Sequence, residues 1–166
     1  MNSGSLIIGI VLVLLFVIPI YFLSRKNSSK DKKLLTFFIN MAEQQGLNLS
    51  QTEIWDSIYF IGMDQEAEKL FYLKKTEENE EKVLIGIKEI EKCRVDNVIR
   101  TIKEGKYTTS ATDRIELKIK LNNSNGSEKA IEFYNAHGAG HLILSNQLHL
   151  ADKWAKTINQ KVSQLR

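Results

Sequence analysis

Different kinds of hydrophobic spacing follow one another along the chain. Residues 6–23 are apolar without interruption, and residues 34–46 repeat apolar side chains every three or four positions. From residue 54 the period changes to two, and helical spacing returns over residues 145–163. These patterns are typical of a membrane-spanning helix, an amphipathic helix, β-strands and a second amphipathic helix, in that order. We therefore expect an α+β protein with a strand-rich body.

The uninterrupted apolar run is long enough to cross a bilayer. Its 18 residues would extend about 27 Å as a helix, close to the hydrocarbon thickness. The five residues before it contain no Lys or Arg, whereas a cleaved signal peptide begins with a basic segment. We predict an uncleaved transmembrane helix over residues 6–23, anchored by Leu6, Tyr21 and Leu23, after a short extracytoplasmic segment at residues 1–5.

A basic linker at residues 24–33 predicts the orientation of this helix. The positive-inside rule places the side with more Lys and Arg in the cytoplasm, so we expect the body to face the cytoplasm. The cluster would also contact anionic lipid headgroups. Its members are Arg25, Lys26, Lys30, Lys32 and Lys33, against a single carboxylate at Asp31.

Residues 34–46 are predicted to form a short amphipathic helix. Leu34, Phe37, Phe38 and Met41 would share one face, and Gly46 would end the helix. This face would pack on the body or lie on the membrane surface. We favour packing, because the polar face carries acidic and amide side chains rather than the lysines of an interfacial helix.

The body is predicted to contain seven strands and a closing helix. Alternation is clearest at residues 114–121, where Ile and Leu alternate with charged residues. Since no helix separates the strands, we expect an antiparallel meander that curls into a roll. A helix at residues 145–163, with Trp154 at its centre, would close one end. The expected strands are residues 54–61, 70–73, 83–87, 93–102, 114–121, 130–134 and 142–144, with a loop at 105–112.

This order of elements resembles the pleckstrin-homology superfold over residues 54–163. The layout of the whole chain is similar to that of small bacterial single-pass membrane proteins, a resemblance that implies no activity. Members of the superfold often bind peptides beside the fifth strand and the C-terminal helix. The resemblance implies a possible partner groove at Arg114, Glu116, Lys118 and Trp154. Phosphoinositide binding is not implied, because the loops at residues 64–68 and 77–81 are acidic.

No motif in the body indicates an enzyme, a metal site or a cofactor. His137 and His141 flank a glycine-rich segment that we interpret as a loop, since a zinc site needs three or four ligands. Cys93, the only cysteine, belongs to the alternating set of a strand and is interpreted as a buried small side chain. Removing the five linker cations and Asp31 from the chain totals leaves 18 Lys and Arg against 19 Asp and Glu. Such a nearly neutral body argues against nucleic-acid binding.

These observations leave two functional hypotheses. The first is a membrane-anchored, non-enzymatic binding or scaffolding module for a protein partner, with no small-molecule substrate. The second is sensing of anionic lipids through the basic linker and the helix at residues 34–46. The second hypothesis predicts salt-sensitive vesicle binding by a chain beginning near Arg25, and no binding by one beginning at Leu47.

Overall fold

The computed structural model describes residues 32–104, 107–122, 126–137 and 144–166. The chain divides into two compact units, Met1–Asn40 and Met41–Arg166. Within the described residues, no helix is both long and apolar enough to cross a membrane. The predicted span at residues 6–23 lies outside the described part of the chain, as do Arg25, Lys26 and Lys30.

A helix occupies residues 32–43, close to the predicted amphipathic helix. Phe38 and Ala42 are buried on it, whereas Phe37 is 39% exposed and lies outside the buried stripe. Gly46 follows the helix with a φ of +71°. This is the left-handed conformation that glycine adopts readily just after a helix, so the predicted stop is confirmed.

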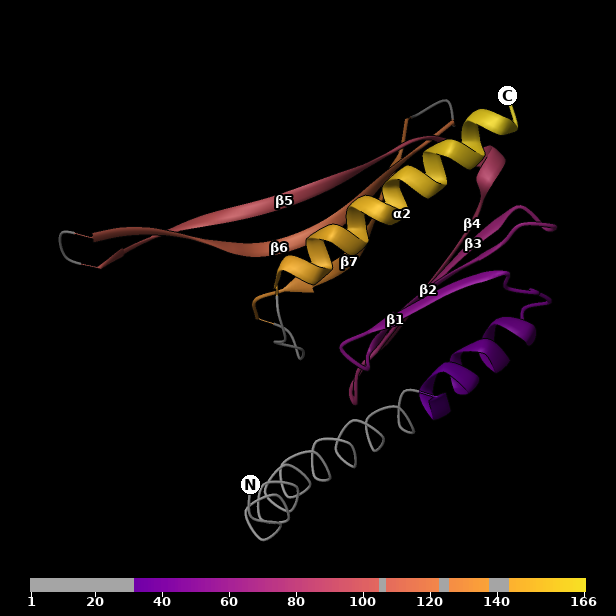
Figure 1. Ribbon diagram of the computed structural model, residues 1–166, viewed down its shortest axis with the longest axis horizontal. Coiled ribbons are helices and arrows are strands. Elements are labelled where there is room, and N and C mark those ends of the chain that lie inside the picture. Colours follow the sequence, from indigo (N-terminus) through magenta and orange to yellow (C-terminus); the bar gives the residue numbers. More distant parts are fainter. Residues whose placement is uncertain (1–31, 105–106, 123–125, 138–143) are drawn as a thin grey trace, which may run out of the picture. The chain divides into compact units, whose positions relative to one another are not determined.

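Seven antiparallel strands form two sheets, each made of strands consecutive in sequence (Figure 1). The predicted α+β class, strand number and antiparallel order are therefore confirmed. The first sheet contains β1 (Gln51–Trp55), β2 (Tyr59–Asp64), β3 (Lys69–Lys75) and β4 (Glu80–Gly86). The second contains β5 (Ile90–Glu104), β6 (Tyr107–Leu121) and β7 (Glu128–Asn135); the 3₁₀-helix η1 (Ile87–Glu89) joins the sheets, and α2 (Leu144–Gln164) follows β7.

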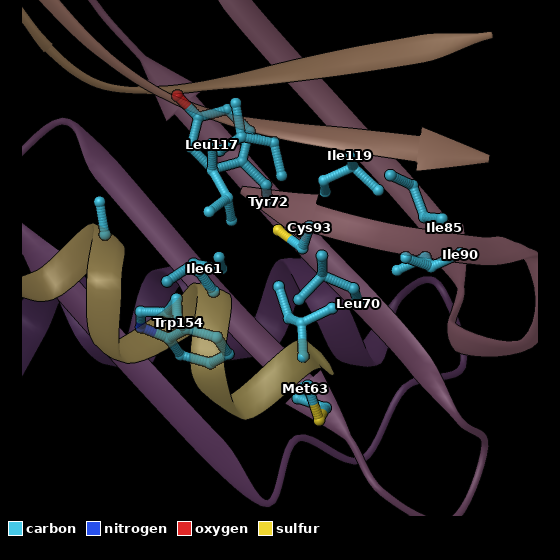
Figure 2. Close-up of a cluster of buried hydrophobic side chains, with 14 of the residues drawn as sticks. Ile61, Met63, Leu70, Tyr72, Ile85, Ile90, Cys93, Leu117, Ile119 and Trp154 are labelled. Atoms are coloured by element: carbon cyan, nitrogen blue, oxygen red, sulfur yellow. The ribbon is translucent and has the colours of Figure 1, made fainter. Parts of the chain in front are cut away.

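The core of the second unit lies among the two sheets and α2. One face of each strand contributes to it, because side chains alternate along a strand; α2 contributes its apolar stripe. Figure 2 shows Trp154 of α2 close to Ile61, Leu70 and Met63 of the first sheet. Trp154 has no exposed surface, so the predicted closing role of the C-terminal helix is confirmed.

The predicted first strand, residues 54–61, is instead a hairpin. β1 ends at Trp55 and β2 begins at Tyr59, and the two strands pair across a turn. Asp56 and Ser57 have φ angles of +50° and +58°, as both central residues of a type I′ turn require. Neither residue is the glycine that usually marks such a turn, and this is why the pattern was misinterpreted as one continuous strand.

One further prediction at the element level was wrong, and another lies largely outside the described residues. The expected loop at residues 105–112 is strand from Tyr107 onward, because β6 begins there. Its Thr-rich sequence suits a strand, since β-branched side chains favour extended backbone. The expected seventh strand at residues 142–144 falls largely outside the described residues, and Leu144 begins α2. The described residues still contain seven strands, because the predicted first strand corresponds to both β1 and β2.

Candidate interaction surface

The structure separates the four residues of the predicted groove. Trp154 lies in the core on the same side as Leu117, which alternates with Glu116 and Lys118 along β6. Arg114, Glu116 and Lys118 therefore point to the opposite face of the sheet. Glu116 pairs with both cations there, at 3.2 Å from Arg114 Nε and 2.6 Å from Lys118 Nζ. The three charged groups satisfy one another and do not line a groove with Trp154.

The strand that carries these three residues also has no open edge where they lie. β6 is the middle strand of its sheet, with Glu116 opposite Asp96 of β5 and Glu132 of β7. A peptide cannot add a strand to an edge whose backbone groups are already paired. If a partner binds the second sheet by strand addition, it must use another part of that sheet.

The outer edge of β5 is closed by side chains of α2 over its first half. Asn159 Oδ1 accepts from the backbone N–H of Cys93 at 2.9 Å, and Asn159 Nδ2 donates to Cys93 O at 2.7 Å. Arg166 donates to Glu91 O at 2.8 Å. Asn159 thus supplies the two hydrogen bonds that a neighbouring strand would supply, so the seam between β5 and α2 is already filled.

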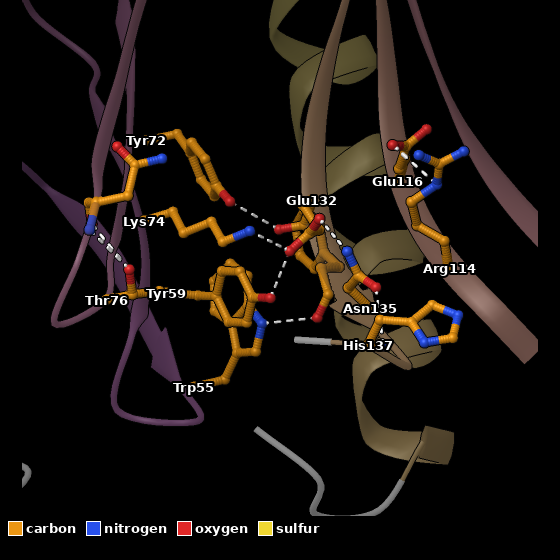
Figure 3. Close-up of polar contacts among 12 residues, drawn as sticks. Trp55, Tyr59, Tyr72, Lys74, Thr76, Arg114, Glu116, Glu132, Asn135 and His137 are labelled. Carbon is orange, nitrogen blue, oxygen red and sulfur yellow. Dashed lines mark hydrogen bonds and ion pairs between the residues drawn. The ribbon is translucent and has the colours of Figure 1, made fainter. Parts of the chain in front are cut away.

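The outer edge of β7 is closed by side chains of the first sheet (Figure 3). The Tyr72 hydroxyl donates to Glu132 O at 2.9 Å, and the Trp55 indole N–H donates to Phe133 O at 2.9 Å. The Glu132 carboxylate accepts from the Tyr59 hydroxyl and from Lys74 Nζ, both at 2.6 Å. These contacts join β1, β2 and β3 to β7 and occupy two adjacent carbonyl groups of β7 that an incoming strand would need.

The Glu132 cluster does not have the properties of a catalytic site. Burial would raise the pKa of Glu132, but the hydrogen bonds from Lys74, Tyr59 and Asn135 outweigh it and lower the pKa below its usual value. Burial raises the pKa of Tyr59 and that of Tyr72 well above the ordinary tyrosine value. The carboxylate therefore stays ionised and the hydroxyls stay protonated near neutral pH, so neither is poised to exchange protons.

The other candidates from the sequence carry no reactive chemistry. Cys93 is 2% exposed, and burial raises the pKa of its thiol to about 12, which suppresses the reactive thiolate. His137 is largely exposed and lies 3.4 Å from Asp113, while His141 is outside the described residues. The described residues contain no cluster of three metal-ligating side chains.

A polar hollow of about 380 Å³ lies between α2 and the first sheet. Amide side chains dominate its lining, and no carboxylate, histidine or cysteine contributes. Lys161 and Thr157 are its only ionisable and hydroxyl side chains, and no second titratable group accompanies the lysine. The lining residues are Gln51, Met63, Gln65, Thr157, Gln160, Lys161 and Gln164.

The most exposed part of the second sheet is an arm formed by β5 and β6. We define the β5–β6 arm as residues 98–104 of β5 and 107–113 of β6. The β6–β7 pairing ends at Arg114 opposite Asn135, whereas β5 and β6 stay paired out to Glu104 opposite Tyr107. The arm extends well past α2 in Figure 1. It exposes Ile99 at 59% and Tyr107 at 80%.

The arm is not among the sites predicted from the sequence, although the sequence contains a signal for it. The alternation of Cys93, Val95, Asn97 and Ile99 with charged neighbours predicts the strand at residues 93–102, whereas residues 105–112 are predicted to be a loop. Residues 107–112 read YTTSAT, with three β-branched side chains and no proline or glycine, which suits an extended strand.

Comparisons with known proteins identify no relative. The chain matches no protein-family model, no curated protein and no solved structure.

Proposed function

We propose that this chain is a non-enzymatic binding module, anchored in a membrane by residues 6–23 with its body facing the cytoplasm. The β5–β6 arm is its contact surface for a protein partner. We also propose that the body has the pleckstrin-homology superfold. This assignment is supported by the order of four strands, three strands and a C-terminal helix.

The observation that carries the proposal is that the arm has exposed apolar side chains and that none of the described elements packs over it. Two-stranded ribbons without a covering layer are only marginally stable in water. A ribbon of this kind gains stability when a partner covers it, which makes it suited to binding. The anchor would hold the arm near the membrane, where partners are concentrated in two dimensions.

Site-specific cross-linking in cells tests the arm as a contact surface. A photo-activated amino acid replaces Ile99 or Tyr107 in the full chain, and in a matched control it replaces Lys156, which is exposed on α2. We expect a discrete protein adduct at both arm positions that saturates with expression level, and none at Lys156. Equal adducts at all three positions would contradict the proposal.

The alternative function is contact with anionic lipid through the basic linker. Lys32 and Lys33 of this cluster are both exposed on the helix at residues 32–43, as lipid contact would require. The same cross-linking distinguishes the two functions. Absence of any protein adduct at the arm, together with salt-sensitive vesicle binding that is lost in a chain beginning at Leu47, would favour the lipid function over the protein partner.

A further inference from the structure

The edges of the three-stranded sheet differ in how they are protected. Exposed strand edges pair readily with other chains, and proteins commonly block them with charges, prolines or covering groups. On β5, Asn159 and Arg166 cover the edge near the core, and Arg100 and Lys103 follow on the arm. On the arm part of β6, residues 107–112 carry no charge and no proline. They pair with β5 on one edge, and on the other edge no strand of the described residues lies beside them.

The direction of the backbone groups along this edge follows from the register. The Asn159 side chain bonds to both backbone groups of Cys93, so the N–H and C=O of Cys93 point away from β6. The irregularity between Val98 and Ile99 places the additional residue on β6, because their partners are Arg114 and Thr112. Along β5, the backbone groups of successive residues therefore continue to alternate between pointing toward β6 and pointing away from it.

The backbone N–H and C=O of Thr101 therefore point away from β6, as those of Cys93 do, because the two positions differ by an even number along β5. Its cross-strand partner is Ser110. Directly opposite residues in an antiparallel pair either bond to each other through both backbone groups or both point these groups away from each other. Ser110 therefore also presents its N–H and C=O away from β5. The same alternation applies to Thr108 and Thr112, the partners of Lys103 and Ile99.

We propose that residues 107–112 of β6 pair with the same residues of a second copy of this chain, antiparallel and centred on Ser110. In that register Ser110 lies opposite Ser110 and Thr108 lies opposite Thr112, so all three outward residues of each copy form hydrogen bonds. Closed two-fold symmetry of this kind is the commonest arrangement of homo-oligomers.

The chemistry of the segment favours a second copy over a charged peptide. An uncharged strand meets its own copy without like-charge repulsion, whereas the arm has no acidic or basic row along this edge to select a charged partner. The body is also nearly neutral, with 18 cationic and 19 anionic side chains after Lys33. This inference rests on the proposed function, because it names the partner of the same arm and relies on the anchor to concentrate the chains.

Disulfide formation in membranes tests the pairing. The full chain carries Cys93→Ala to remove the native thiol, together with Ser110→Cys or, as a control on the opposite edge, Thr101→Cys. Opposed residues of an antiparallel pair are about 5.5 Å apart at Cα, within the range that a disulfide spans. We expect Ser110→Cys chains to form a covalent dimer on mild oxidation and Thr101→Cys chains not to. No dimer, or equal dimer at both positions, would overturn the pairing.

Two alternative proline substitutions, one on each edge of the arm, provide the second measurement. Mixed Thr108→Cys and Thr112→Cys chains should cross-link to each other, since these positions are opposed. Adding Ser110→Pro removes an outward N–H without touching the β5–β6 ladder, and should reduce this cross-link at least tenfold. Thr101→Pro, which removes an outward N–H on the other edge, should leave it unchanged. Equal effects of both prolines would contradict the assignment of the edge.

The two proposals can fail separately. Chains that remain monomeric here but still give protein adducts at Ile99 and Tyr107 would overturn the self-pairing and leave the proposed function standing. A β6 dimer without any adduct to another protein would support self-pairing as the purpose of the arm. An arm that neither dimerises nor gives adducts would overturn both.

Discussion

At the scale of single residues, Glu132 joins the two sheets through contacts with Tyr59, Tyr72 and Lys74. Its side chain is 15% exposed and lies 2.6 Å from Lys74 Nζ. Hydrogen bonds to ionised groups are among the stronger ones in proteins, because removing one partner leaves a desolvated charge. Glu132 is therefore the residue at which stability should depend most clearly on pH.

We predict that Glu132→Gln lowers the free energy of unfolding by about 1–3 kcal/mol at pH 7. The pKa of Glu132 is lowered in the folded chain, so its contribution is fully present above the unfolded-state pKa. That contribution is lost as pH falls through the folded-state pKa. The difference between the wild type and the variant should therefore shrink below roughly pH 4.

Urea unfolding at several pH values measures this difference. Glu91→Gln is the matched control, because Glu91 pairs with Lys120 on the surface, with both side chains more than 40% exposed. Such exposed pairs contribute little, so its effect should be small at every pH. A Glu132→Gln effect that is independent of pH would show that the charge of Glu132 is not what stabilises the cluster.

At the scale of elements, the β1–β2 turn is a site where the sequence is not optimal for its own conformation. Ser57 has a φ of +58°, which costs an L-residue roughly 1–2 kcal/mol. Ser57→Gly removes that cost but makes the unfolded chain more flexible. We predict a net stabilisation of about 0.5–1 kcal/mol, measured as a rise in the urea midpoint.

Gly46→Ala is the converse test. A Cβ at Gly46 would have no heavy atom within 4 Å, so any loss of stability must come from its φ of +71°. We expect a loss of about 1 kcal/mol. If Ser57→Gly destabilised while Gly46→Ala had no effect, backbone strain would not govern these turns.

The sequence predicts elements well where one face is clearly apolar. Ile115, Leu117 and Ile119 are fully buried, as their alternation indicates, and the stripe on α2 places Trp154 in the core. The hairpin at Asp56 and Ser57 was missed because its conformation is imposed by pairing of the flanking strands rather than by glycine. Long-range pairing is not encoded in local spacing, so alternation alone cannot show which edge of a strand is covered.

The candidate site was less predictable for the same reason. The apolar stripe on α2 predicts that Trp154 is buried, but closure of the β5 edge by Asn159 depends on how α2 packs against β5, which residue spacing along the helix does not specify. Arg114, Glu116 and Lys118 lie on the face of β6 opposite Leu117, but Glu116 is 7% exposed and the strand that carries them is central. The exposed arm depends on where β7 ends at Asn135, a boundary that the sequence marks only weakly.

At the scale of the whole molecule, the orientation of the body can be tested with an introduced cysteine. The native Cys93 cannot serve, because it is 2% exposed and the pKa of its thiol is raised to about 12 by burial. In a Cys93→Ala chain, Lys156→Cys places a thiol on the exposed side of α2. We predict labelling by a membrane-impermeant maleimide only after the cells are opened.

A cysteine at Ser3 in the same background provides the opposite reporter. It should react in intact cells, since residues 1–5 are proposed to lie outside the cytoplasm. Labelling of Lys156→Cys in intact cells would place the body outside and contradict the proposed orientation.

The packing of α2 has a consequence for the order in which the body can be completed during synthesis. Within each sheet, strands that are consecutive in sequence pair with one another, so each sheet can form as soon as its strands leave the ribosome. The core also needs Trp154 and Ile158 of α2, which are translated after all seven strands. A nascent chain therefore passes through a stage in which both sheets exist with one apolar face uncovered, and chaperones that recognise exposed apolar surface would act during that interval.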